Sequence, residues 1–324
     1  GASGNVQYTE FKYMGTFRAL GRYPIHTHQM SDTSRGMVIR GNAVWFSGNR
    51  AYTLHDSNGI LLEDNVSFNT VASPYFIEHK EPPDVLPPQD NILSHNLGVE
   101  SIPALVPSEP AISGVTGVMD DTAIFWFDQF LYQTVVGNVA VGSWTFSGPT
   151  GRSAGFSLDE HSAFAVSGKP AYFFFRKNEA HSNRNFGVLT WISPNEPFDM
   201  VGFHVWRNGG TGFFSGSYVA PYHWMNIRSV ENGVYQVDIR GVKFHLQDSE
   251  LIGGGNDWTK NPLNKAVIDS ISSGVDIGIN AQAYVASQAP DWPARVIRTV
   301  FQNNPTDVTQ DHVACTGADI VLQT

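Results

Sequence analysis

Val38-Ile39-Arg40-Gly41-Asn42 recurs further along the chain as Leu61-Leu62-Glu63-Asp64-Asn65, and this repeated unit decides the fold. Each copy is a short apolar run that ends in a turn-forming asparagine. The spacing from Asn42 to Asn65 is the shortest between successive units of this kind, and the other spacings exceed it by variable lengths. That pattern is typical of stacked coils with loops inserted at one turn. The further units end at Asn96, Asn138, Asn178, Asn208 and Asn232.

The positions three residues before these asparagines predict one inward-facing column. A coil of this kind buries its inner side chains only against the coils above and below it. Asparagine suits the repeated turn because it tolerates left-handed backbone angles and its amide can bond along a stack. Six of the seven column positions are large and apolar, and the seventh is serine: Ile39, Leu62, Leu93, Val135, Phe175, Val205 and Ser229.

The composition favours an all-β fold in one continuous domain. Only 15% of the 324 residues are charged, and the chain contains 31 Gly and 18 Pro, a balance that favours strands and turns over helices. We expect the coils over residues 1–255, and a C-terminal cap or terminal coils over residues 256–324. Residues 81–88 are expected to form a loop, because proline lacks the backbone donor that a central strand requires.

The bulk properties disfavour several classes of function. A formal net charge of −10 without a visible basic patch argues against a nucleic-acid surface. The chain has no run of about 18 apolar residues that would span a membrane. Its single cysteine, Cys315, cannot form an intrachain disulfide. The start, Gly1-Ala2-Ser3-Gly4, lacks a leader pattern, so we expect any native signal peptide to have been removed.

Counting forward from the turn asparagines predicts a column of polar residues. Asn42 plus 13 is His55, Asn65 plus 13 is Glu78, and His28 takes the equivalent place one coil earlier. Strand alternation turns Ile25, Tyr52 and Tyr75 inward and the polar residues outward, with His26 beside His28. We call His28, His55 and Glu78 the polar column.

Three chemical roles are open for the polar column. Two imidazoles and a carboxylate suit a transition metal such as zinc, with His26, His28, His55 and Glu78 as ligands. Without a metal, the same residues supply a general acid and base, with His28, His55 and Glu78 as catalytic groups. Glu78 is then expected to have a raised pKa and a histidine to titrate near neutrality. The third role is structural, in which these groups bond only to each other and to loop backbone.

Other residues are candidates for binding a substrate. Arg22 lies just before His26 and can hold a carboxylate in bidentate fashion, as can Arg40, Arg50 and Arg184. Trp191 occupies the offset of 13 from Asn178 and can stack on a sugar. His181, three residues after Asn178, can approach the same groove or cap a turn.

Four motifs resemble one family. Gly21-Arg22-Tyr23-Pro24-Ile25-His26-Thr27-His28 resembles the G-R-Y-P-[IV]-H-x-H signature of the cell-migration-inducing hyaluronan-binding protein, transmembrane protein 2 and the fibrocystin-like receptors. Thr53 to Leu61 is similar to V-H-x-S-N-G-[IL]-L, and Tyr75 to Glu78 is similar to F-F-x-E. Residues 178–183 are similar to N-x-A-H-S-N. The resemblance covers roughly residues 20 to 250 and is scattered outside these motifs.

The resemblance implies a single-stranded, right-handed parallel β-helix at the cell surface or outside the cell, associated with hyaluronan binding or depolymerisation. Carried over position by position, it points to His26, His28, His55, Glu78 and His181. This chain lacks the cysteines of the animal members and the glycine-rich domain that usually precedes the helix. Because of both departures, the resemblance does not identify the glycan on which this chain acts.

The leading hypothesis is therefore a secreted or cell-surface β-helix that binds and cleaves a polysaccharide, as a hydrolase or a lyase. The polar column would be its reactive centre, with or without zinc or copper. Two other classes of protein remain. One is a non-catalytic surface module that binds a glycan or a protein, and the other is a protein whose function is the capture of copper or zinc.

Overall fold

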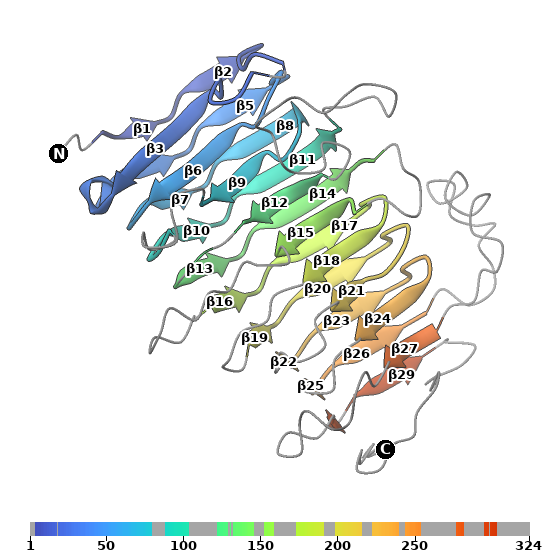
Figure 1. Cartoon of the computed structure of the whole chain (residues 1–324). Coiled ribbons are helices and arrows are strands. Elements are labelled where there is room, and N and C mark those ends of the chain that lie inside the picture. Colours follow the sequence, from blue (N-terminus) through green and yellow to red (C-terminus); the bar gives the residue numbers. More distant parts are fainter. Residues whose placement is uncertain are drawn as a thin grey trace.

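The chain folds into a parallel β-helix (Figure 1). The computed structural model describes residues 4–17, 19–79, 88–103, 122–128, 130, 132–145, 152–158, 173–190, 198–215, 222–239, 244–253, 277–281, 295–297 and 299–302. Consecutive strands enter three sheets in strict rotation, and every pairing between neighbouring strands is parallel. β1 and β29 lie at opposite ends of the stack. In the described part of the chain, no helix is long and apolar enough to cross a membrane.

Among the described residues, successive coils contribute ten strands to each of the first two sheets and nine to the third. The first sheet holds β1 (Val6–Gln7), β4 (Val38–Arg40), β7 (Leu61–Glu63), β10 (Ile92–Ser94), β13 (Gln133–Val136), β16 (Phe173–Arg176), β19 (Phe198–Val201), β22 (Tyr222–Met225), β25 (Phe244–Gln247) and β28 (Arg295–Ile297). The second sheet holds β2 (Glu10–Lys12), β5 (Ala43–Trp45), β8 (Val66–Val71), β11 (Leu97–Ile102), β14 (Val139–Ser143), β17 (Glu179–His181), β20 (His204–Trp206), β23 (Arg228–Val230), β26 (Glu250–Ile252) and β29 (Val300–Gln302). The third sheet holds β3 (Ile25–Ser31), β6 (Tyr52–Ser57), β9 (Tyr75–Glu78), β12 (Ala123–Phe127), β15 (Ala154–Leu158), β18 (Phe186–Thr190), β21 (Phe213–Ser215), β24 (Tyr235–Ile239) and β27 (Ile277–Ala281), and the 3-10 helix η1 (Asp32–Ser34) follows β3.

The core is built from inward rows that run along the stack. In the third sheet, the rings of Tyr52, Tyr75, Phe125 and Phe156 stack with successive centroids 4.8, 4.5 and 4.8 Å apart. These separations match the spacing of about 4.8 Å between hydrogen-bonded strands, so each ring packs on the ring of the next coil. All four rings are buried. Ile25 is buried in the same core, so the predicted inward orientation of Ile25, Tyr52 and Tyr75 is confirmed.

A buried asparagine ladder holds the turn between the first and second sheets. The side-chain amide of Asn42 donates to Asn65 (3.0 Å), Asn65 donates to Asn96 (2.9 Å), and Asn96 donates to Asn138 (2.9 Å), which donates to Asn178 (3.0 Å). The same side chains also bond to backbone groups of the adjacent coils. The ladder satisfies polar groups that no water reaches, as a buried turn requires.

The prediction that Asn208 and Asn232 continue this ladder is wrong. They stack with Asn183 in the other turn, between the second and third sheets, at 2.9 and 2.8 Å. Buried Phe203 and Ile227 take the places that correspond to Asn178 on the next two coils. The single inward column predicted from the sequence is therefore two separate columns. Its first five members lie in the first sheet, whereas Val205 and Ser229 lie in the second.

The predicted register of the polar column is confirmed. His28 pairs with His55 in neighbouring strands, and His55 pairs with Glu78. Beyond residue 255, β27, β28 and β29 join the same three sheets. Most of the proline-rich segment 81–88 lies outside the described residues, as does Cys315.

Candidate functional site

The polar column takes one residue each from β3, β6 and β9, on the outer face of the third sheet. Strand pairing places the three residues on successive coils about 4.8 Å apart. His28 is exposed, whereas His55 is 8% and Glu78 only 2% exposed. The column is therefore open to solvent at its first coil and covered at its third.

Three histidine rings form one cluster at the open end. The centroids of His28 and His55 lie 4.6 Å apart with the rings edge to face, and those of His26 and His28 lie 5.2 Å apart. The rings of His26 and His55 are parallel at 6.3 Å. The predicted grouping of His26 with the polar column is thus what the structure shows.

Arg50 supplies the positive charge of the site. Its Nη1 lies 3.0 Å from Oε2 of Glu78, and its guanidinium carbon lies 3.5 Å from the centre of the Phe76 ring. Tyr23 contacts the same nitrogen through its hydroxyl oxygen at 3.3 Å. The guanidinium stabilises the carboxylate form of Glu78. A carboxylate held in this ion pair can act as a base or stabilise positive charge.

Asp56 joins two histidines beneath the column, a contact that the sequence analysis missed. Its Oδ2 lies 2.9 Å from Nε2 of His55, and its Oδ1 accepts a hydrogen bond from Nδ1 of His79. Alternation alone places His79 on the opposite face, but Asp56 has a left-handed backbone (φ 44°) that interrupts alternation. The signal was present in the sequence, because Asp56 and His79 are separated by one coil length, the same spacing as Asn42 and Asn65.

The two histidines hold Asp56 in its ionised form. Burial on its own would raise the pKa of Asp56, but hydrogen bonds from His55 and His79 outweigh this and lower the pKa to about 2. A carboxylate that is ionised at neutral pH fixes the ring orientation of both histidines. Asp56 thereby sets the orientation of the His55 ring, which lies edge to face with His28.

His26 is expected to stay neutral until the medium is strongly acidic. Burial, and then the charge of nearby His28, lower the pKa of His26 from 6.5 to about 4. Since the unfolded chain binds this proton first as the pH falls, His26 contributes stability above pH 6.5 that is lost toward pH 4. We expect ring resonances of His26 in NMR spectra to titrate with a midpoint near pH 4. A His26→Gln variant assigns the resonance, and a midpoint at or above pH 6.5 would contradict the placement of His26.

The structure places two of the predicted substrate-binding residues, Arg22 and His181, outside the histidine cluster and the Glu78 ion pair. Arg22 is exposed in the turn before β3, and Arg50, not Arg22, contacts Glu78. His181 lies on the second sheet, where its ring stacks on Trp206 with centroids 4.2 Å apart. Trp191 lies outside the described residues.

The predicted metal ligands all belong to this cluster. Within the part of the chain that the structure describes, no group of three or more His, Cys, Asp or Glu side chains is arranged to hold a metal ion. Two of the predicted ligands have other partners, because Glu78 is paired with Arg50 and His55 with Asp56. A zinc or copper ion on His26, His28, His55 and Glu78 stays a prediction from the sequence.

Without a metal, the cluster still has the groups needed for proton transfer. The neutral imidazole of His26 and the exposed imidazole of His28 flank the open end, and carboxylates lie behind His55. Imidazole can accept or donate a proton near neutral pH. The arrangement is suited to acid–base chemistry on a ligand that lies along the outer face of the third sheet.

Comparison with known proteins places these residues within a matched segment. A family model described as "CEMIP beta-helix" matches residues 1–188. This segment includes β1 to β17, the first part of β18 and the whole polar column. The chain is 27% identical over 213 residues to human "Cell surface hyaluronidase CEMIP2", covering 57% of this chain and 14% of that protein. It is 35% identical over 97 residues to human "Fibrocystin-L", covering 30% and 2%.

Among solved structures, the chain is similar to the A-module of mannuronan C-5 epimerase AlgE4 from Azotobacter vinelandii. The TM-score is 0.43 at 10% identity, and the match covers 98% of this chain and 79% of that one. The matched segments cover 14% of human CEMIP2 and 2% of human Fibrocystin-L, so the chain spans only a small part of the length of these curated relatives.

Proposed function

Because the chain belongs to the CEMIP β-helix family, we propose that it binds a uronate-containing polysaccharide, such as a hyaluronan-like chain, and cleaves it at the polar column. One observation carries the proposal. Strand register brings His28, His55 and Glu78 together on three successive coils, although two whole coils of sequence separate the first from the last. Relatives of this chain are named cell surface hyaluronidases, which supports the polysaccharide as substrate and a cell-surface or secreted location.

The charges around the column support two ways of cleaving a uronate chain. In hydrolysis, the Glu78 carboxylate or a neutral histidine activates water, and a protonated imidazole donates to the glycosidic oxygen. In elimination, a neutral histidine removes the proton next to the uronate carboxylate, and the leaving oxygen receives a proton from a second imidazole. In both, His28 contacts the substrate first because it is the exposed member.

The burial of Glu78 favours a second candidate function. Glu78 is 2% exposed and paired with Arg50, an arrangement that also suits a purely structural ion pair. The column would then stiffen a non-catalytic module that binds a glycan on its surface.

A depolymerisation screen separates these functions. Purified protein is incubated with hyaluronan, chondroitin, alginate and polygalacturonate, and product size, reducing ends and the ultraviolet absorbance of unsaturated uronates are followed. We expect cleavage of at least one polyuronate, with the absorbance distinguishing elimination from hydrolysis. Binding without cleavage of any of them would instead favour the non-catalytic module.

Parallel reactions with a chelator, together with metal analysis of the protein, test the predicted ion. Full activity in a protein that contains no metal would exclude the metal version of the site. Tight stoichiometric copper or zinc without cleavage of any glycan would favour metal capture as the function.

A further inference from the structure

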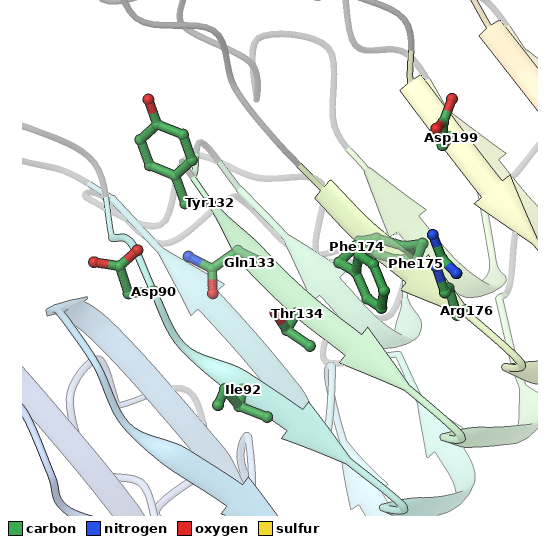
Figure 2. Close-up of a pocket in the computed structure, with 9 residues that line it drawn as sticks. All are labelled: Asp90, Ile92, Tyr132, Gln133, Thr134, Phe174, Phe175, Arg176 and Asp199. Atoms are coloured by element: carbon green, nitrogen blue, oxygen red, sulfur yellow. The ribbon is translucent and has the colours of Figure 1, made fainter.

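A groove crosses the outer face of the first sheet, away from the polar column. It has a volume of about 380 Å³ and is bordered by four neighbouring strands, β10, β13, β16 and β19 (Figure 2). Four coils at a spacing of about 4.8 Å make it about 14 Å long. Its lining includes Asp90, Ile92, Tyr132, Phe174, Arg176 and Asp199. From this groove we infer a second ligand site, which binds a short stretch of uncharged oligosaccharide and is independent of the polar column.

An exposed aromatic ring provides the platform for a sugar. Phe174 is 45% exposed and Ile92 is 42% exposed, and both line this groove, so they form a small apolar patch on its floor. The guanidinium carbon of Arg176 lies 4.0 Å from the centre of the Phe174 ring and holds the ring in place. The exposed part of the ring can pack on the C–H face of a pyranose.

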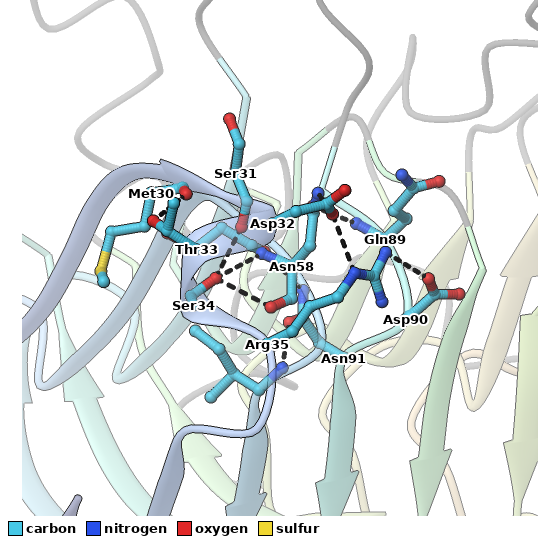
Figure 3. A network of polar contacts seen from close by, with 12 residues as sticks. Met30, Ser31, Asp32, Thr33, Ser34, Arg35, Asn58, Gln89, Asp90 and Asn91 are labelled. Atoms are coloured by element: carbon cyan, nitrogen blue, oxygen red, sulfur yellow. Dashed lines mark hydrogen bonds and ion pairs between the residues drawn. The ribbon is translucent and has the colours of Figure 1, made fainter. Parts of the chain in front are cut away.

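Two carboxylates are fixed at the sides of the groove. Asp90 accepts a hydrogen bond of 2.8 Å from Arg35, which also bonds to Asp32 of η1 at 2.8 Å (Figure 3). Asp199 lies 3.5 Å from Nδ1 of His223 on the next coil. The side chains of Asp90 and Asp199 are each 47% exposed, so both carboxylates can accept hydrogen bonds from sugar hydroxyl groups.

The charge of the groove selects against an acidic glycan. Among the described residues that line it, Asp90 and Asp199 are acidic and Arg176 is basic, and Arg35 beside Asp90 is shared with a further carboxylate, Asp32. The chain as a whole has a formal net charge of −10. A polyuronate would meet like charges here, whereas the polar column offers Arg50 and histidines. The two faces therefore differ in the ligand that they favour.

Calorimetric titration of the whole chain with cellohexaose, mannohexaose and an N-acetylglucosamine hexamer tests the groove. We expect at least one of these uncharged probes to bind, and Phe174→Ala to weaken that binding at least about tenfold, equivalent to about 1.4 kcal/mol. Phe46→Ala is the matched control, because Phe46 is 42% exposed but lies on another face. It should leave the affinity unchanged.

Two further binding measurements distinguish the groove from the polar column. Glu78→Gln should not alter the binding of the uncharged probe, and a hyaluronan hexasaccharide should bind equally well to the wild type and to Phe174→Ala. The inference is overturned if none of the uncharged probes binds the wild type, or if Phe174→Ala binds as tightly as Phe46→Ala. Loss of binding in Glu78→Gln would also overturn it, since the ligand would then occupy the polar column.

Discussion

Glu78→Gln is expected to lower the rate of polyuronate cleavage at least about 100-fold without unfolding the protein. The loss follows from the removal of a carboxylate that takes part in proton transfer or charge stabilisation, which contributes about 10² to 10⁴ to a rate. Glutamine keeps the volume of Glu78, and its amide oxygen can still accept a hydrogen bond from Arg50. The measurement is the initial rate of appearance of reducing ends on the substrate found in the screen.

Glu63→Gln provides the matched control for this substitution. Glu63 also pairs with an arginine of the preceding coil, Arg40, at 2.6 Å, but it lies on the first sheet. Its replacement should leave the rate within about twofold of the wild type, since this half-buried ion pair lies on a different sheet from the polar column. Equal rates for Glu78→Gln and the wild type would remove Glu78 from the reaction.

Asn96→Ala is expected to have the largest effect on stability, about 3–5 kcal/mol. The Asn96 amide donates to Asn138 and to the carbonyl of Leu62, and its oxygen accepts from the side chain and backbone of Asn65. Alanine leaves these buried groups unpaired, at a cost of about 1–3 kcal/mol for each group that finds no new partner. Domains have total stabilities of only about 5–15 kcal/mol. The measurement is urea unfolding of both proteins.

Asn5→Ala is the control for the ladder. The Asn5 oxygen accepts a single exposed hydrogen bond from the backbone of Val38, so its loss should cost no more than about 1 kcal/mol. A similar small cost for Asn96→Ala would show that the ladder does not stabilise the turn.

The coil and the polar column could be predicted from the sequence because both depend on backbone periodicity. A constant coil length fixes which residues pair, and strand alternation fixes which face they take. This reasoning gave the pairing of His28, His55 and Glu78, and the inward stack that begins at Tyr52.

The same reasoning failed where two turns use the same residue type. Asparagine stabilises both the turn before and the turn after the second sheet, so Asn178 and Asn208 appeared to continue one ladder. The residue that follows Asn178 in its ladder position is Phe203, and an apolar residue there carries no turn signal. Spacing alone does not distinguish two asparagine turns of one coil.

The remainder of the site depends on side-chain reach and on a single backbone angle. Arg22 is closer to His26 in sequence, but the long side chain of Arg50 reaches Glu78 across one coil. Asp56 contacts His79 on the adjacent coil, and the left-handed backbone at Asp56 interrupts the alternation of β6. The contact of Arg50 with Glu78 does not follow from periodicity, whereas the interval between Asp56 and His79 identifies them as neighbours once the coil length is known.

The most direct test of the polysaccharide site is a crystal structure of the Glu78→Gln protein with a hyaluronan hexasaccharide, or with the equivalent fragment of whichever polyuronate the wild type cleaves. The sugar chain is expected to lie along the outer face of the third sheet, with a glycosidic oxygen within hydrogen-bond distance of His28 or His55. A chain bound on another sheet, with the polar column untouched, would contradict the assignment of His28, His55 and Glu78 as the reactive centre.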